Sequence, residues 1–239
     1  MEWELLILIP LETGTIQSNW RDKEKISMEE IILGRLKIRR ERPEDYHEVE
    51  NLTREAFWDV YCPGCSEHLV LHQLRKSKGF VPELDYVVTD GTQIIGNIVY
   101  SRSLVAAESG QRTEILTFGP ISVLPSFQGK GIGKEMIRYT CEKAKSLGYK
   151  AIAITGNNHY YNPLGFQSAS KYGIHLEGIP KEEEAPFFMI MELEEGGLEG
   201  CEGICVFDSA FDTNPEELAC FDTAFPHKEK RESRSTGLG

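Results

Sequence analysis

The stretch Gln128-Gly129-Lys130-Gly131-Ile132-Gly133-Lys134 lies between a segment of strand character and a segment of helix character. Its three glycines leave several backbone N–H groups able to point at one ligand, and the first N–H groups of a helix have no partner within the helix. The helix dipole adds to the attraction for negative charge. The stretch therefore predicts an anion-binding turn suited to a pyrophosphate.

Two common phosphate-binding loops do not fit this stretch. A Walker loop requires Ser or Thr after its lysine, whereas Lys134 is followed by Glu135. A dinucleotide fingerprint has the spacing Gly-x-Gly-x-x-Gly after the first strand of the domain, whereas here the glycines alternate and several strand-like segments come before them. A glycine-rich connection without a ligand stays open as an alternative.

The motif that fits is Gln/Arg-x-x-Gly-x-Gly/Ala after a strand that ends in Val-x-Pro, here Val123-Leu124-Pro125-Ser126-Phe127-Gln128. A second motif, Tyr160-Tyr161-Asn162-Pro163-Leu164-Gly165-Phe166, is similar to Tyr-x-x-x-Gly-Phe. At the proper separation, the two motifs resemble the GNAT superfamily of N-acetyltransferases over residues 35–195. The runs 118–123 and 63–68 further resemble the bacterial predicted-acetyltransferase group of that superfamily.

The resemblance implies an α/β (α+β) fold, in which helices flank a mixed, mostly antiparallel sheet. It implies about six to seven strands, with a splay between the fourth and the fifth. The periodicity of apolar residues agrees with this order. It predicts strands at 36–39, 85–89, 93–105, 114–123, 150–155 and 187–193, and helices from 42, over 67–75, over 133–147 and near 160–164. Gly119-Pro120 predicts a bulge in the strand before the loop.

The chain is expected to divide into three parts. Residues 1–27 have weak periodicity and are expected to form a loosely attached leader. Residues 28–195 form the expected acetyl-CoA-binding domain. Residues 196–239 form an extension with a short helix after Asn214, which is a favourable N-cap, and a polar, disordered tail from Lys228.

The resemblance also implies the site. The co-substrate is acetyl-CoA, with its pyrophosphate on the loop and its pantetheine along the backbone of the preceding strand. The residues expected to bind it are Ile121, Ser122, Val123, Gln128, Gly129, Lys130, Gly131, Ile132, Gly133, Lys134 and Asn157. Tyr161 is the expected catalytic acid that protonates the departing thiolate, although a tyrosine beside Gly-Phe can also simply pack a sheet edge.

The base that deprotonates the acceptor amine is not identified by the sequence. Many members of the superfamily carry a glutamate about six residues before Val123, where this chain has Thr117. Glu67, His68 and Glu114 are candidates, each with a surface or structural role as the alternative. The expected activity is transfer of an acetyl group to a primary amine by direct attack on the thioester. A non-catalytic domain that binds or senses acyl-CoA is the alternative.

Composition limits the partners. The 239 residues carry a net charge of −12, which argues against the basic face that nucleic acid requires. The six cysteines are expected to be free thiols in a reducing cytoplasm, and no membrane segment is expected. One Cys-x-x-Cys, at Cys62 and Cys65, is a weak metal or redox signal, so no metal is expected. A small-molecule or peptide amine and a homodimer are the partners left open.

Overall fold

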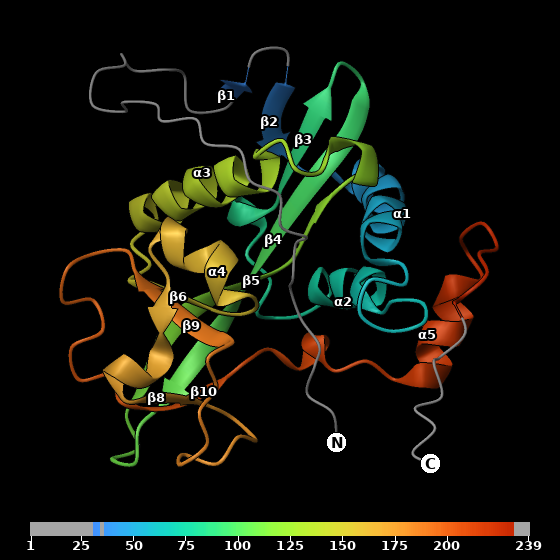
Figure 1. The fold of residues 1–239 in the computed structure, drawn as a ribbon. Helices are drawn as coiled ribbons and strands as arrows, with labels where there is room; N and C mark the ends of the chain where they lie inside the picture. The colour runs from blue at the N-terminus through green and yellow to red at the C-terminus, as the bar shows by residue number, and fades with distance from the viewer. Residues whose placement is uncertain (1–30, 34–35, 232–239) are drawn as a thin grey trace.

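The computed structural model describes residues 31–33 and 36–231 (Figure 1). Within them the strands form one ten-stranded sheet. The strands are β1 (Ile31–Leu33), β2 (Leu36–Arg40), β3 (Tyr86–Asp90), β4 (Gln93–Ala106), β5 (Arg112–Val123), β6 (Ala151–Thr155), β7 (Gln167–Ser168), β8 (Ile174–Leu176), β9 (Phe188–Glu192) and β10 (Gly203–Val206).

The helices cover both faces of the sheet (Figure 1). They are α1 (Tyr46–Phe57), α2 (Glu67–Leu74), α3 (Ile132–Ser146), α4 (Asn158–Tyr161) and α5 (Pro215–Asp222). On one face, α1 and α2 pack on Val87, Ile94 and Val99 of β3 and β4. On the other face, α3 buries Met136 and Ile137 against a core that includes Ile98. This division follows from alternation, since successive side chains of a strand point to opposite faces.

The order of the main path is β1-β2-β3-β4-β5-β6-β9-β7. Neighbouring strands pair antiparallel except β5 with β6 and β8 with β10. The expected class, a mixed and mostly antiparallel sheet flanked by helices, is therefore confirmed. The sheet has more strands than expected because β1, β7 and β8 are too short to show a period, and because β10 comes from the C-terminal extension and pairs with β4 where β3 has ended.

The splay predicted between the fourth and fifth long strands lies between β5 and β6. Their pairing is limited to Leu116 with Ile152 and Thr117 with Ala153, although β5 continues to Val123. The predicted bulge is also present, since the register of β5 against β4 shifts where Gly119 and Pro120 face Val99. From Phe118 onward, one edge of β5 is thus unpaired within the described part of the chain, and the two strands diverge beside the glycine loop.

The C-terminal extension packs on the domain. The predicted helix is confirmed as α5, and the Asn214 side chain caps it by accepting from the N–H groups of Glu216 and Glu217. Residues 228–231, expected to be disordered, contact α1 and the loop after it. The leader expected over 1–27 and the tail over 232–239 lie outside the described residues. The three-part division of the chain stays a prediction. No helix between residues 36 and 231 is long and apolar enough to cross a bilayer.

Candidate acetyl-CoA site

The glycine loop joins the end of β5 to the start of α3 and has the backbone that an anion site needs. Gly129 and Gly131 have φ values of 73° and 82°, a left-handed conformation that costs little only for glycine. A Cβ atom at either position would meet nothing within 4 Å. Backbone conformation rather than crowding therefore explains these two glycines. Gly131 is the N-cap of α3.

The N–H groups of residues 129–134 have no acceptor among the described residues, whereas that of Gln128 donates to the Pro125 carbonyl at 3.3 Å. The next N–H with a backbone partner is that of Glu135, which donates to the Gly131 carbonyl at 3.1 Å. Two side chains stabilise the turn by hydrogen bonds to its backbone. Gln128 Nε2 donates to the Val123 carbonyl and Lys130 Nζ to the Ser126 carbonyl, both at 3.0 Å. The N–H groups of residues 129–134 are therefore available for phosphate oxygens.

The three cations of the loop and the first turns of α3, which are Lys130, Lys134 and Arg138, have different partners. Lys130 lies 4.8 Å above the Phe127 ring, and Arg138 forms an ion pair with Glu135. Lys134 lies 5.5 Å above the ring of Tyr160, one residue before the expected catalytic tyrosine. Lys134 thus lies between the loop and α4. The predicted cofactor residues of the loop and Tyr161 therefore belong to one region.

The side chains of the strand before the loop are used by the fold. Ile121 and Val123 lie in the core beneath α3. On the opposite face, Ser122 Oγ donates to Thr53 Oγ1 at 3.1 Å, and Thr53 Oγ1 donates to Asn97 Oδ1 at 3.2 Å. For a ligand these residues leave the backbone groups on the edge away from β4, and their binding role stays a prediction. Asn157 caps α4 by accepting from the His159 N–H at 2.9 Å, so its side chain has a structural role.

Tyr161 lies at the point where β5 and β6 separate. Its side chain is fully buried, with ring contacts to Phe118 at 6.1 Å, Tyr160 at 4.9 Å and Phe166 at 5.6 Å. Its hydroxyl has no hydrogen-bond partner. Burial raises the pKa of Tyr161 well above the usual value for tyrosine, and Tyr160 and Tyr61 raise it further. The hydroxyl therefore stays protonated at neutral pH and can act as a donor.

Tyr61 is a residue of this region that sequence reasoning missed. It lies in the loop between α1 and α2, and it raises the pKa of Tyr161 electrostatically. Its ring also packs 6.3 Å from that of Phe57. No local pattern predicts this influence, because the two tyrosines are far apart in the sequence.

Neither Thr117, at the position where many members of the superfamily carry a glutamate, nor the candidate base Glu114 is placed for proton transfer. The Thr117 hydroxyl is buried and shares a 2.7 Å hydrogen bond with Ser103 Oγ. Glu114 is half exposed, faces Arg102 at 3.6 Å, and lies near the opposite end of β5 from the glycine loop. Neither is placed to accept a proton from an amine at the splay.

Glu67 and His68 are both buried at the start of α2. The Glu67 carboxylate accepts from the Ser66 N–H at 3.0 Å, and burial raises its pKa to about 7. His68 lies 3.1 Å from Asp222 and 3.6 Å from Cys65 through its two ring nitrogens, and burial lowers its pKa to about 4. His68 is therefore a neutral structural residue, whereas Glu67 is half protonated near pH 7.

The six cysteines are free thiols, as expected. Residues 31–33 and 36–231 contain no group of three or more His, Cys, Asp or Glu side chains that could hold a metal ion.

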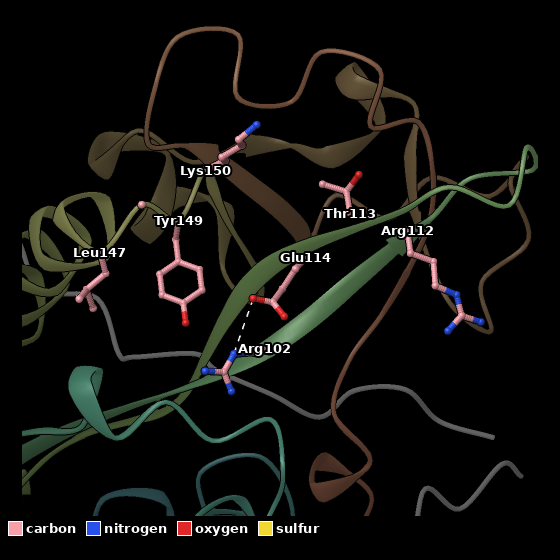
Figure 2. A pocket seen from close by; sticks show the side chains of 8 residues that line it. Arg102, Arg112, Thr113, Glu114, Leu147, Tyr149 and Lys150 are labelled. Atoms are coloured by element: carbon pink, nitrogen blue, oxygen red, sulfur yellow. Dashed lines mark ion pairs between the residues drawn. The ribbon is translucent and has the colours of Figure 1, made fainter.

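A hollow of about 530 Å³ lies at the other end of α3, away from the glycine loop (Figure 2). It is lined by Arg102, Arg112, Thr113, Glu114, Leu147, Gly148, Tyr149 and Lys150. In Figure 2 the Arg112 and Lys150 side chains point away from the Arg102–Glu114 ion pair. The cations therefore do not converge on one point, and the hollow is not the site of the loop ligand.

The features of the splay fit acetyl-CoA. Unpaired N–H groups at a helix start suit its pyrophosphate, an unpaired strand edge suits its amide-containing arm, and an unpartnered buried hydroxyl suits its sulfur. In agreement, residues 83–168 match the family model described as "Acetyltransferase (GNAT) domain".

Three relatives agree with this match. The Escherichia coli (strain K12) protein named "Uncharacterized N-acetyltransferase YjhQ" is 26% identical over 110 residues, which span 45% of this chain and 60% of that protein. A GNAT family acetyltransferase from Brucella melitensis, solved with acetyl-CoA, is 26% identical, has a TM-score of 0.57, and is matched over 74% of this chain and 98% of that one.

The GNAT family N-acetyltransferase YhbS from Escherichia coli, solved with CoA, has a TM-score of 0.64 at 21% identity, with 80% of this chain and 96% of that chain covered. This likeness shows the fold. Residues 83–168 of the present chain thus carry the match to the GNAT acetyltransferase domain, and the described residues have the fold of these GNAT structures.

Proposed function

We propose that this chain transfers an acetyl group from acetyl-CoA to a primary amine. The observation that carries the proposal is the Tyr161 hydroxyl, which is buried and unpartnered where β5 and β6 separate. A buried polar group without a partner is costly, so such a group is retained where a ligand completes its bonding. The complexes of two similar structures with CoA and acetyl-CoA support this choice of donor.

When bound, acetyl-CoA supplies a thioester whose carbonyl carbon accepts the amine. The N–H groups of residues 129–134 hold the pyrophosphate, and Lys134 adds positive charge beside it. The backbone of Ile121 to Val123 aligns the pantetheine along the free edge of β5, and a backbone N–H near Val123 stabilises the oxyanion. These residues position the thioester against Tyr161.

Tyr161 serves as the general acid. As the new C–N bond forms and the C–S bond breaks, its hydroxyl gives a proton to the leaving sulfur. Its raised pKa keeps this proton in place until the thiolate develops. The amine must lose a proton as well, and an amine with a pKa of about 10.4 needs roughly 4.6 kcal/mol to reach its free base at pH 7. Water or a side chain near the splay has to accept that proton.

A second candidate function is acyl-CoA sensing without transfer. Thr117 favours it, because this hydroxyl is bonded to Ser103 at the position where a proton acceptor would be useful. The glycine loop is equally suited to both functions, since binding requires only the donor site.

The test is an assay of thiol release from acetyl-CoA with a panel of amines: spermidine, kanamycin, lysine and an alanine-initiated peptide. A transferase releases CoA in proportion to one of these amines and yields the acetylated amine by mass spectrometry. Binding of acetyl-CoA without release above the uncatalysed rate for every amine would contradict transfer and favour the sensor.

A further inference from the structure

The C-terminal segment, residues 215–231, lies against α1, α2 and the loop between them (Figure 1). We call residues 58–66, which connect α1 to α2, the acceptor-side loop. The segment follows the domain in sequence by many residues, but its contacts are with the first two long helices. These contacts fall into three groups, one ionic, one aromatic and one directly on the loop.

The ionic group is centred on Asp222, near the end of α5. Asp222 accepts from Arg54 Nε at 2.6 Å and from Arg54 Nη2 at 3.1 Å, and its Oδ1 lies 3.1 Å from His68 Nε2. The side chains of Arg54 and His68 are 1% and 0% exposed. Burial tends to raise the pKa of Asp222, but the bonds and charge of Arg54 hold it below its usual value. Asp222 is thus the counter-ion of a buried arginine of α1.

The aromatic group surrounds the same ion pair. Phe221 and Phe225 pack on histidines of α1 and α2, with ring centroids 4.5 Å apart for His72 and Phe221 and 5.1 Å apart for His47 and Phe225. Arg54 also lies 4.2 Å above the ring of Trp58, the first residue of the acceptor-side loop. The ion pair and the loop are therefore joined through one stacked arginine.

The third group of contacts is made by residues 228–231. Lys228 Nζ donates to Glu55 at 2.7 Å, Trp58 Nε1 donates to the Glu229 carbonyl at 3.0 Å, and the Arg231 N–H donates to Asp59 Oδ2 at 3.0 Å. Asp59 has a φ of 57°, unusual outside glycine, and it closes the loop by accepting from the Gly64 N–H at 2.6 Å. The segment thus holds a strained turn in place.

The acceptor-side loop continues from α1, whose Thr53 Oγ1 accepts from Ser122 Oγ of β5 at 3.1 Å. Tyr61 of the loop also raises the pKa of Tyr161. Displacement of the loop would move Tyr61 relative to the Tyr161 hydroxyl, while the glycine loop at the start of α3 makes no recorded contact with residues 215–231. Among the described residues, the C-terminal segment is therefore in contact with α1, α2 and the acceptor-side loop, and makes no hydrogen bond to the glycine loop.

We propose that Asp222 is a positioning residue that holds the acceptor-side loop through Arg54 and His68. Productive binding of the amine, and not of acetyl-CoA, then depends on the C-terminal segment. The inference rests on the proposed function. A small displacement of groups that border a reacting centre is enough to lower binding or turnover strongly.

The test compares Asp222→Asn with Glu216→Gln, which removes an equal charge from the same helix at a carboxylate that has no recorded ion pair. With the best amine of the panel, Asp222→Asn should raise the KM for the amine at least about fivefold and leave the KM for acetyl-CoA within about twofold. Glu216→Gln should change neither. An unchanged KM for the amine in Asp222→Asn, or an equal rise in both KM values, would overturn the proposal.

A second variant keeps the ion pair of Asp222 with Arg54, so the proposal can be tested even if Asp222→Asn does not fold. Lys228→Met removes both the bond to Glu55 and the contact of Nζ with the Trp58 ring, and it should raise the KM for the amine in the same direction, by at least about twofold. If Asp222→Asn does not fold, an unchanged KM in Lys228→Met overturns the proposal.

A measurement that needs no acceptor amine tests the positioning role of Asp222 independently of the proposed transferase function. Cys62 is an exposed thiol of the acceptor-side loop. Its alkylation by iodoacetamide, followed by peptide mapping to separate it from Cys220, should be at least about threefold faster in Asp222→Asn if the loop is released. Equal rates would contradict positioning, even if no amine were a substrate. Failure of every amine with faster alkylation would contradict only the transferase function.

Discussion

The ring of Tyr161 lies 6.1 Å from the ring of Phe118, centroid to centroid, and Phe118 is the first residue of β5 beyond its last pair with β6. The residue expected to be catalytic therefore meets the sheet where its strands part. In a continuous sheet this tyrosine would be one more buried aromatic residue. Here its hydroxyl has no hydrogen-bond partner, and β5 runs on from Phe118 to Val123 without a pair to β6.

Tyr161→Phe should lower turnover at least about tenfold and leave acetyl-CoA affinity nearly unchanged, because it removes a proton donor but keeps the ring contacts. Steady-state thiol release and calorimetric titration measure the two quantities. Tyr160→Phe is the control, since that ring is also buried and lies beside Tyr161. Equal turnover of wild type and Tyr161→Phe would remove Tyr161 from the mechanism.

Gly131→Ala should weaken acetyl-CoA binding about tenfold. The added Cβ meets no atom, but alanine disfavours a φ of 82° by roughly 1–2 kcal/mol, so the loop should leave the conformation that points its N–H groups at the pyrophosphate. The control is Gly110→Ala, which has a φ of 88° and open space in a distant turn. If calorimetry found the same affinity loss in both variants, the loop would have no special role.

The pH dependence of stability should show two opposite contributions from neighbouring residues. The pKa of Glu67 is raised from 4.5 to about 7, so the native state binds the extra proton and stability falls as the pH rises from 4.5 to 7. The pKa of His68 is lowered from 6.5 to about 4, so the unfolded state binds the extra proton and stability rises between pH 4 and 6.5. The two contributions oppose each other between about pH 4.5 and 6.5.

Relative to the wild type, Glu67→Gln should therefore gain about 3 kcal/mol of unfolding free energy as the pH rises from 4.5 to 7, and His68→Gln should lose a similar amount as the pH rises from 4 to 6.5. Urea unfolding at several pH values measures both. Parallel curves for the wild type and the two variants would show that neither group has a perturbed pKa.

Loss of the Asp222 carboxylate should also lower stability. Removing one partner of a buried ion pair costs about 3–5 kcal/mol, and the low end applies here because Asp222 is 26% exposed. Chemical denaturation of Asp222→Asn should show this loss, whereas Glu216→Gln should stay within about 0.5 kcal/mol of the wild type. A loss below about 1 kcal/mol in Asp222→Asn would contradict the role of Asp222 as the counter-ion of Arg54.

Much of the domain was predictable because its signals are local. The period of apolar residues gives β4, β5, α3 and β6, and the glycines that need a left-handed backbone mark the loop and the end of α3. The motif that contains Tyr161 also lies on one short segment. Such patterns depend on neighbours within a few residues, which a sequence displays directly.

The remaining features depend on contacts between distant segments. The pairing of β10 with β4 and the ion pair of Asp222 with Arg54 have no local signature. The polar run 228–231 has the composition of a disordered tail, yet Glu55, Trp58 and Asp59 provide partners for it. Composition cannot show partners that only the fold brings close.

The most direct measurement is a titration of the ¹⁵N-labelled protein with acetyl-CoA, followed through its backbone amide resonances. The glycine loop and the free edge of β5 are predicted to hold the donor, so the largest shifts should fall on residues 121–123 and 129–134. Saturable binding with its largest shifts at the Arg102–Lys150 hollow, or no binding, would contradict the assignment of the splay as the acetyl-CoA site.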